Sequence, residues 1–288
     1  MSKYKVRVMK KNNMNEPKYI PSPLKNQMIN YKVYYMSALE KIIYFLITFL
    51  IGGIAGYIFY GGLFKYEGEA TTATYISNIV VFVVVGMIAA KFFVPAIRKH
   101  LKEKRAKKLQ KQFMDFMEVL AASLAAGNTL KDSFVNAKKD LLNQYLESDM
   151  IIIELSEIIS GLDNGITLET MLDNFGDRSN NDDIQNFSNV MSNCYRLGGD
   201  FKSVVRRTRD IISDKIAVSE EITTKISSNK LQHNVMCIMP IVLVAMLKLA
   251  SPSFANNLAS FIGVFVTTIA IVIFIISYFW GQKIVDIR

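Results

Sequence analysis

Four long apolar runs constrain the fold of this chain more than any other feature. They cover residues 42–60, 76–94, 235–250 and 258–280. A hydrocarbon core about 30 Å thick needs roughly 20 helical residues, so the first, second and fourth runs are long enough to cross a membrane. The third run is shorter, and its Lys248 lies near one end, where a long side chain can reach the interface. Four buried apolar helices would otherwise need a very large soluble core, so the sequence predicts four transmembrane helices.

The distribution of charge predicts how these helices are oriented. Residues 1–41 carry nine Lys or Arg against two Glu, and residues 98–111 carry eight against one Glu, so each segment has a net charge of +7. Residues 61–73 hold one Lys and two Glu, and residues 251–257 hold no charge. Lys and Arg concentrate in cytoplasmic loops. We therefore expect both termini and residues 98–234 to be cytoplasmic.

The basic balance of the chain does not indicate a nucleic-acid partner. The sequence pI is about 9.3, but residues 113–230 hold 12 Lys or Arg against 19 Asp or Glu, a net charge of −7. The excess positive charge lies beside the apolar runs, where it favours an anionic lipid surface. The chain has two cysteines, Cys194 and Cys237, and two histidines. This inventory predicts no metal site, no disulfide scaffold and no cofactor.

The segment between the two pairs of apolar runs has a helical pattern throughout. Its first stripe recurs at positions i, i+3, i+4, i+7 and i+11, which is one face of a helix, and consists of Phe113, Phe116, Met117, Leu120 and Leu124. No part of this segment alternates with period two over a length that would indicate a strand. The sequence therefore predicts an all-α integral membrane protein, with a cytoplasmic helical bundle inserted between two pairs of transmembrane helices.

Three breaks between these helices share one pattern. Each has a glycine, one free position, a Thr or Asp, and then a large apolar residue that begins the next helix. Glycine ends a helix because it enters the left-handed conformation without a Cβ penalty, and the Thr or Asp accepts hydrogen bonds from free N–H groups of the next helix. The predicted helix-turn residues are Gly127, Thr129, Gly165, Thr167, Gly198, Gly199 and Asp200.

The third break, Gly198-Gly199-Asp200-Phe201, is also close to the GGD(E)EF loop of enzymes that make cyclic dinucleotides. That loop lies at a β-hairpin in an α/β domain, whereas here it joins two amphipathic helices. The second acidic residue that would hold a metal ion is also missing, because Phe201 and Lys202 follow Asp200. We therefore interpret the motif as a helix turn with no catalytic residue.

The order of the three breaks and the apolar runs around them resemble the type II secretion system F domain family. The resemblance is carried by "FMEVLAASLAAGNTLKDSF", "GLDNGITLETML" and "LGGDFKSVV", which begin at residues 116, 161 and 197. A single F domain is similar to the platform proteins of tight-adherence (Tad/Flp) pilus systems. The resemblance implies a six-helix bundle with helices at residues 109–126, 130–142, 149–162, 168–176, 182–197 and 201–229.

The resemblance also implies a function. Such a protein is a platform in the plasma membrane of a bacterium or archaeon, between a cytoplasmic secretion ATPase and the pilin subunits that enter a filament. A second related platform subunit is an expected partner, in a homo- or hetero-oligomer. The expected layout is a basic arm at 1–41, two spans in 42–97, a basic linker at 98–111, the F domain at 112–230 and two spans in 231–288.

Catalytic motifs are missing from the sequence, which has no P-loop, no Gly-x-Ser-x-Gly and no converging set of acids. The chain is therefore not expected to be an enzyme. A membrane channel or transporter with a regulatory helical domain is the alternative function. Transporters place ionisable residues in mid-span, whereas Lys91 and Lys248 lie near the ends of their runs, so the platform is favoured.

The remaining candidates concern contacts with partners and between helices. Gly52 and Gly56 form a GxxxG pattern that lets another helix approach closely, within the chain or between subunits. Pro240 predicts a kink in the third span, either static or able to flex. The basic strip at 98–111 has three candidate uses: anchoring to anionic lipid, docking on an acidic surface of the ATPase, or forming a solvated helix face. The candidate partner-binding residues are Arg206, Arg207 and Arg209, with an acidic set of Asp173, Asp177, Asp182 and Asp183.

Overall fold

The structure, a computed structural model, describes residues 16–64 and 71–285. It is 81% helical, and its only described strands have three residues each, so the all-α prediction is confirmed. Among the described helices, four are long and apolar enough to cross a membrane. The charged residues within 1–15, 65–70 and 286–288, some of which were used to predict the orientation, lie outside the described residues.

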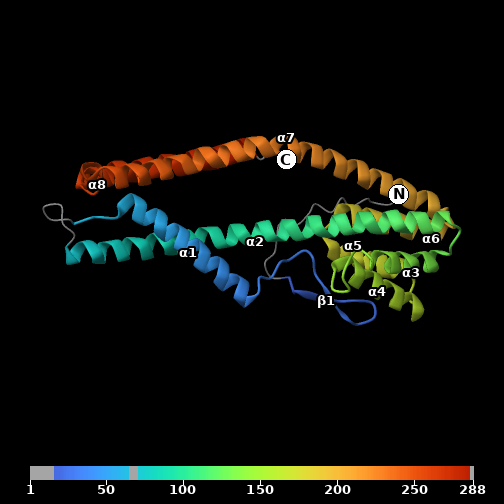
Figure 1. Cartoon of the computed structure of the whole chain (residues 1–288). Coiled ribbons are helices and arrows are strands. Elements are labelled where there is room, and N and C mark those ends of the chain that lie inside the picture. Colours follow the sequence, from blue (N-terminus) through green and yellow to red (C-terminus); the bar gives the residue numbers. More distant parts are fainter. Residues whose placement is uncertain (1–15, 65–70, 286–288) are drawn as a thin grey trace, which may run out of the picture. The chain divides into compact units, whose positions relative to one another are not determined.

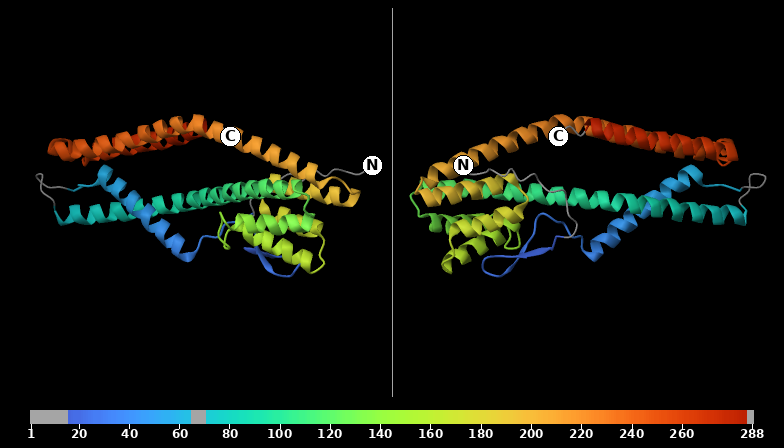
Figure 2. Two further views of the ribbon diagram at one scale, coloured as in Figure 1. Left: turned by 45° about the vertical axis from the view of Figure 1, so that its right-hand side comes forward. Right: turned by 180° about the vertical axis from the view of Figure 1, so that it is seen from behind.

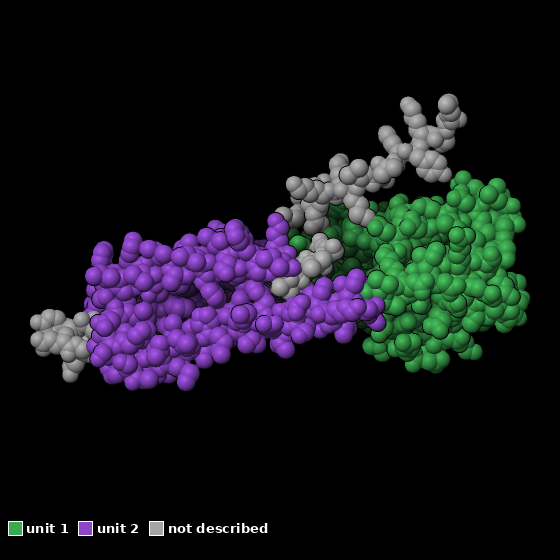
Figure 3. Space-filling view, turned by 90° about the horizontal axis from the view of Figure 1, so that it is seen from above, with its two compact units in different colours: residues 1–35, 98–218 green, residues 36–97, 219–288 purple. Residues whose placement is uncertain are grey.

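The chain divides into two compact units, coloured separately in Figure 3. One unit holds the residues up to Tyr35 together with Arg98–Val218, and the other holds Met36–Ile97 together with Ser219–Arg288. We call the first the bundle unit and the second the membrane unit. Each is described by itself below.

Helix α2, Thr72–Ala125, contains three segments that the sequence had suggested were separate. It includes the second apolar run, the basic linker at 98–111 and the first helix of the bundle. Residues 96–126 contain no Gly or Pro, so the helix has no local reason to stop where the side chains change from apolar to basic. Pro95 lies inside the helix, and costs it one backbone hydrogen bond.

The bundle unit contains four further helices, labelled in Figure 1. They are α3 Leu130–Leu141, α4 Met150–Asp163, α5 Leu168–Ser179 and α6 Asp182–Leu197, and they pack with parts of α2 and of α7, Phe201–Ala250. Five fully buried phenylalanines form the centre of this core, with neighbouring ring centroids 5.4–6.3 Å apart: Phe113, Phe116, Phe134, Phe175 and Phe187. The sequence had ended α5 at residue 176. The helix continues to Ser179 and stops at Asn180, a non-glycine residue in the left-handed conformation (φ 53°).

Successive helices of the bundle run in opposite directions, which gathers the three glycine breaks at one end. Lys131 at the start of α3 forms an ion pair of 2.7 Å with Asp163 at the end of α4. Arg196 at the end of α6 likewise pairs with Glu169 at the start of α5. We call this the turn end of the bundle.

The opposite end of the bundle has its own ion pairs, and we call it the base. There Lys108 pairs with Asp149 at 2.6 Å, and Lys215 pairs with Asp183 at 2.7 Å. These contacts join α2 to the N-cap of α4, and α7 to the first turn of α6.

A short β-hairpin that the sequence analysis did not predict packs on the bundle (Figure 2). Strand β1, Tyr19–Pro21, pairs in antiparallel fashion with β2, Gln27–Ile29. Residues 16–35 thus belong to the bundle unit. The two strands have three residues each, which is too short for an alternating apolar pattern to be recognised in the sequence.

In the membrane unit, α1, Ala38–Tyr60, packs against the first part of α2 through its glycines. A Cβ added to Gly52 would lie 2.4 Å from the Cβ of Ala89, and one added to Gly56 would lie 2.8 Å from the Cβ of Val85. The approach is reciprocal, because a Cβ on Gly86 would lie 2.7 Å from the carbonyl oxygen of Phe49. The GxxxG pattern is therefore occupied by a contact within the chain.

The C-terminal half of the membrane unit contains the end of α7, then α8, Pro252–Leu258, and α9, Phe261–Val285. Pro240 lies inside α7, where its missing N–H leaves one helical bond unmade. The ammonium of Lys248 donates to the carbonyls of Ile58 and Gly61, at 3.0 and 2.6 Å. It thereby satisfies free carbonyls at the C-terminal end of α1, a position where a positive charge is favourable.

The contact between α1 and α2 gives a test of the packing in the membrane unit. Gly52→Ala should lower the thermal unfolding midpoint of the detergent-purified protein, because overpacking a close contact costs about 1–3 kcal/mol. Ala89→Gly removes the methyl group that the new Cβ would meet first. The double variant should therefore recover most of the lost stability. An unchanged midpoint in Gly52→Ala would show that the two helices are not packed this closely.

Candidate partner-binding surface at the turn end

The three glycine breaks have the same backbone geometry. Gly127, Gly165 and Gly198 all have positive φ, at 88°, 77° and 65°. In each break the N–H of the residue after the glycine donates back to a carbonyl in the last turn of the helix: Asn128 to Ser123 at 3.4 Å, Ile166 to Gly161 at 2.9 Å, and Gly199 to Cys194 at 2.9 Å. This bond spans six residues and defines the Schellman motif. One mechanism therefore ends α2, α4 and α6.

The N-cap of the next helix lies two residues after each of these glycines. The hydroxyl oxygen of Thr129 accepts from the N–H of Asp132 at 3.1 Å, and that of Thr167 accepts from the N–H of Thr170 at 3.4 Å. At the third break a carboxylate oxygen of Asp200 accepts from the N–H of Lys202 at 3.0 Å. The repeated unit is thus a Schellman motif followed at once by an N-cap.

Basic and apolar side chains are exposed beside the third break. Arg206 and Arg207 are exposed and form no ion pair with any residue that the structure describes. Arg209, by contrast, pairs with Asp210 at 2.5 Å. In the last turn of α6, Leu197 is 85% exposed and Tyr195 is half exposed. A surface that combines free guanidinium groups with exposed apolar area suits a protein partner.

The acidic candidates do not lie with these arginines. Asp173 accepts hydrogen bonds from Ser188 at 2.5 Å and Ser192 at 3.2 Å, which joins α5 to α6. Asp183 is buried at the base, where it accepts from Gln110 at 2.9 Å and from Lys215 at 2.7 Å. The arginines lie closer to the turn end on α7, where Arg206 precedes Lys215 by nine residues, about 14 Å along the helix axis.

Two members of the acidic set, Asp177 and Asp182, are exposed. The structure therefore places Asp177, Asp182 and Asp183 toward the base and the arginines toward the turn end. Two of the four acids hold helices of the bundle together and are not free to meet a partner.

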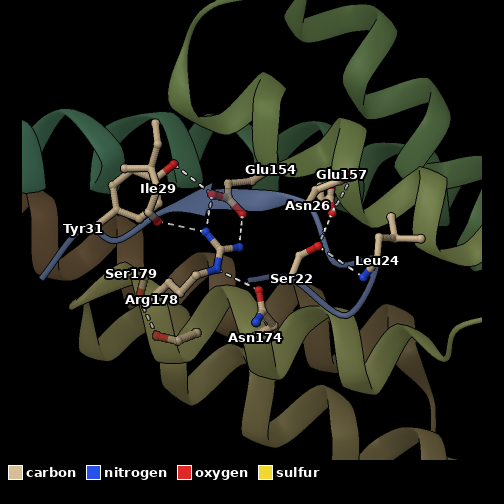
Figure 4. A network of polar contacts seen from close by, with 11 residues as sticks. Ser22, Leu24, Asn26, Ile29, Tyr31, Glu154, Glu157, Asn174, Arg178 and Ser179 are labelled. Carbon is tan, nitrogen blue, oxygen red and sulfur yellow. Dashed lines mark hydrogen bonds and ion pairs between the residues drawn. The ribbon is translucent and has the colours of Figure 1, made fainter. Parts of the chain in front are cut away.

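A buried network of charges between α4, α5 and the hairpin was missed by the sequence analysis (Figure 4). The guanidinium of Arg178 forms two hydrogen bonds with the carboxylate of Glu154, at 2.8 and 2.6 Å. Their side chains are only 3% and 1% exposed. Arg178 also donates to Asn174 at 2.7 Å, and to the carbonyl of Ile29 in the hairpin at 3.0 Å.

Tyr31 completes this network by donating its hydroxyl to Glu154 at 2.9 Å. Burial and the neighbouring Glu154 carboxylate raise the pKa of Tyr31 well above its ordinary value. The hydroxyl therefore stays protonated and remains a donor. The sequence did carry a signal for the pair, because Glu154 lies between Ile151 and Ile158 on an apolar stripe and Arg178 follows Phe175 by three residues.

Two further observations on the described residues concern metal ions and pockets. These residues contain no group of three His, Cys, Asp or Glu that could hold a metal ion. A hollow of about 420 Å³ lies beside α3 and α4, and its charged lining residues are Lys138, Glu147 and Glu157. Of these, Glu157 is already engaged by Ser22 and Asn26 of the hairpin.

Comparison with known proteins assigns the helical segment to a family. Residues 116–248 match the family described as type II secretion system (T2SS), protein F. These residues therefore form a type II secretion system F domain, as the sequence pattern had indicated. No curated protein and no protein of known structure matches the chain.

The third break gives a test of the turn geometry. A Cβ on Gly198 would meet no atom within 4 Å, so Gly198→Ala should cost only the left-handed backbone strain, about 1–2 kcal/mol. Gly198→Asn should cost less, because Asn tolerates this conformation. The measurement is the thermal unfolding midpoint of the two purified variants. Equal midpoints for Ala, Asn and the original Gly would contradict a strained position.

The two Arg–Glu pairs of the bundle give a matched comparison of burial. Glu154→Gln should destabilise the protein by about 3–5 kcal/mol, because it leaves the buried charge of Arg178 without a counter-charge. Glu169→Gln breaks the pair with Arg196, which is 68% exposed, and should cost about 1 kcal/mol or less. Chemical denaturation of both variants in detergent measures the difference. A similar cost at the two sites would show that the Arg178–Glu154 pair is not desolvated.

Proposed function

We propose that this protein is a platform of a tight-adherence (Tad/Flp) pilus or a related secretion machine, in the plasma membrane of a bacterium or archaeon. In this role it couples a cytoplasmic secretion ATPase to the insertion of pilin subunits into a filament. The observation that carries the proposal is the F domain at residues 116–248 in a chain with four candidate membrane spans. Proteins of this family are typically membrane platforms of secretion and pilus systems.

The platform acts without chemistry of its own. Proteins of the F family are structural and are not enzymes, so the energy for filament assembly comes from the ATPase. In this proposal the bundle unit and both termini are cytoplasmic, as the positive charge at 1–41 and 98–111 supports. The positive charge of these segments favours an anionic lipid surface, and no nucleic acid is bound.

The surface that we assign to the ATPase includes Arg206 and Arg207 near the turn end. Their guanidinium groups form no ion pair with any described residue, and Leu197, in the last turn of the preceding helix, is exposed. An acidic surface with an apolar centre on the partner would complement them. Asp177 and Asp182, at the base, are left for a second related platform subunit in a homo- or hetero-oligomer.

The position of Lys248 near the end of its span supports a platform over a channel or transporter, because transporters place ionisable residues in mid-span. In the structure the Lys248 ammonium donates to two backbone carbonyls at the end of α1. Its role in this reading is to cap a helix.

Reversal of the two arginine charges tests the assignment. Arg206→Glu/Arg207→Glu should abolish co-purification with the secretion ATPase encoded in the same organism, because it places negative charge where the partner presents negative charge. Lys138→Glu/Lys139→Glu is the matched control, since it makes the same change in net charge on α3. Both variants should accumulate in the membrane at the level of the unmodified protein.

The control should still co-purify with the ATPase. Pull-down that is unchanged by the arginine reversal would contradict the assigned surface. Deletion of the gene should remove surface filaments in electron micrographs, and filaments that persist at the normal level would contradict the platform function itself.

A further inference from the structure

The hairpin segment, residues 16–35, is held in place by the bundle, and we call it the strap. Its two strands have three residues each, and a two-stranded hairpin of this size has little stability on its own. Its order therefore depends on the contacts that it makes with the helices. Those contacts include directional hydrogen bonds, which fix both position and orientation.

Tyr31 is the central contact of the strap because it reaches three helices at once. Its hydroxyl donates to Glu154 of α4, and its backbone N–H donates to the carbonyl of Arg178 in α5 at 3.0 Å. Its ring lies 5.0 Å from the guanidinium carbon of Arg105 in α2, a cation–π distance. Tyr31 is 5% exposed. A shift of any one of these helices would therefore disturb the contacts that hold the strap on the bundle.

A second set of bonds holds the other end of the hairpin to α4. The hydroxyl of Ser22 donates to Glu157 at 2.5 Å, and the amide of Asn26 donates to the same carboxylate at 3.0 Å. Two anchors at Glu154 and Glu157, on one helix, prevent the strap from pivoting about a single point.

The strap is joined to the first membrane helix by a very short connection. It ends at Tyr35 and α1 begins at Ala38, so only Met36 and Ser37 lie between them. Three residue steps span at most about 11 Å when fully extended. The backbone N–H of Ser37 also donates to Glu40 at 2.9 Å, as part of a capping box that fixes the start of α1. The connection has little length to absorb a displacement.

We propose that the strap is a coupling element, which transmits movement of α2, α4 and α5 in the bundle to the first membrane helix, with Tyr31 as the positioning residue. This inference rests on the proposed function, because it supplies a route from the partner-binding bundle to the membrane helices. It assigns a role to residues 16–35 that the F domain, at residues 116–248, does not include.

The first test measures backbone amide exchange in the purified, detergent-solubilised full chain. Tyr31→Phe removes the hydroxyl that donates to Glu154, whereas Tyr35→Phe removes the hydroxyl that donates to the carbonyl of Glu16. The two variants make the same chemical change within one strap. Tyr31→Phe should speed exchange at residues 41–44 of α1 as well as in the strap, and Tyr35→Phe should leave residues 41–44 unchanged. Faster exchange confined to the strap and the bundle would overturn the proposal.

The second test separates coupling from a purely structural role. A four-residue Gly/Ser insertion between Tyr35 and Met36 leaves every contact of the strap in place but lengthens its link to α1. The same insertion between Asn15 and Glu16, before the strap, is the control. If the strap couples the bundle to α1, the first insertion should reduce the number of surface filaments to that of the deletion strain. The second insertion should leave the number of filaments normal. Both variant proteins should accumulate in the membrane to the same level. Normal output from the first insertion would overturn the proposal.

The deletion strain separates the two hypotheses. Normal filaments in that strain would contradict the proposed function, and the exchange measurement would still decide whether the strap is coupled to α1. Missing filaments in the deletion strain, together with normal filaments from the first insertion, would remove the coupling proposal alone. If the first insertion does not accumulate in the membrane, the exchange result of Tyr31→Phe decides the outcome.

Discussion

The ion pair between Arg178 and Glu154 is the interaction on which the arrangement of the bundle unit depends most. Both groups are removed from water, at a cost of several kcal/mol for each ion. That cost is offset only because each group is surrounded by partners: the two bonds of the pair, the amide of Asn174, the carbonyl of Ile29 and the hydroxyl of Tyr31. The network tolerates few other geometries. It therefore favours one relative position of α4, α5 and the hairpin.

The turn end follows a different principle. Its three breaks are local structures, each made by a left-handed residue and an N-cap two positions later. A Cβ at Gly127, Gly165 or Gly198 would meet no atom within 4 Å, so these positions are constrained by the backbone alone. The directions of the helices at this end are therefore set by the backbone conformation of the breaks.

Features that depend on local sequence could be predicted, and those that depend on distant contacts could not. The apolar runs predicted the four candidate spans, and the glycines predicted the breaks, because span length and helix termination are encoded within short windows. Tyr31 and Glu154 are 123 positions apart, and the sequence around either residue does not indicate that the other is its partner. The continuity of α2 was missed for another reason. A change from apolar to basic side chains was taken as a boundary, although the backbone contains no residue that would break the helix after Pro95.

The contact of Lys248 with the end of α1 has a consequence for biosynthesis. The ammonium and the carbonyl of Ile58 are separated by 190 positions. At a synthesis rate of about 5–20 residues per second, roughly 10–40 s pass between the appearance of the two groups. During that interval the carbonyls at the end of α1 lack the Lys248 ammonium as a partner. This contact between the first and third candidate spans therefore forms only after Lys248 has been synthesised. The bundle, which lies between them in the sequence, is translated earlier and has time to fold first.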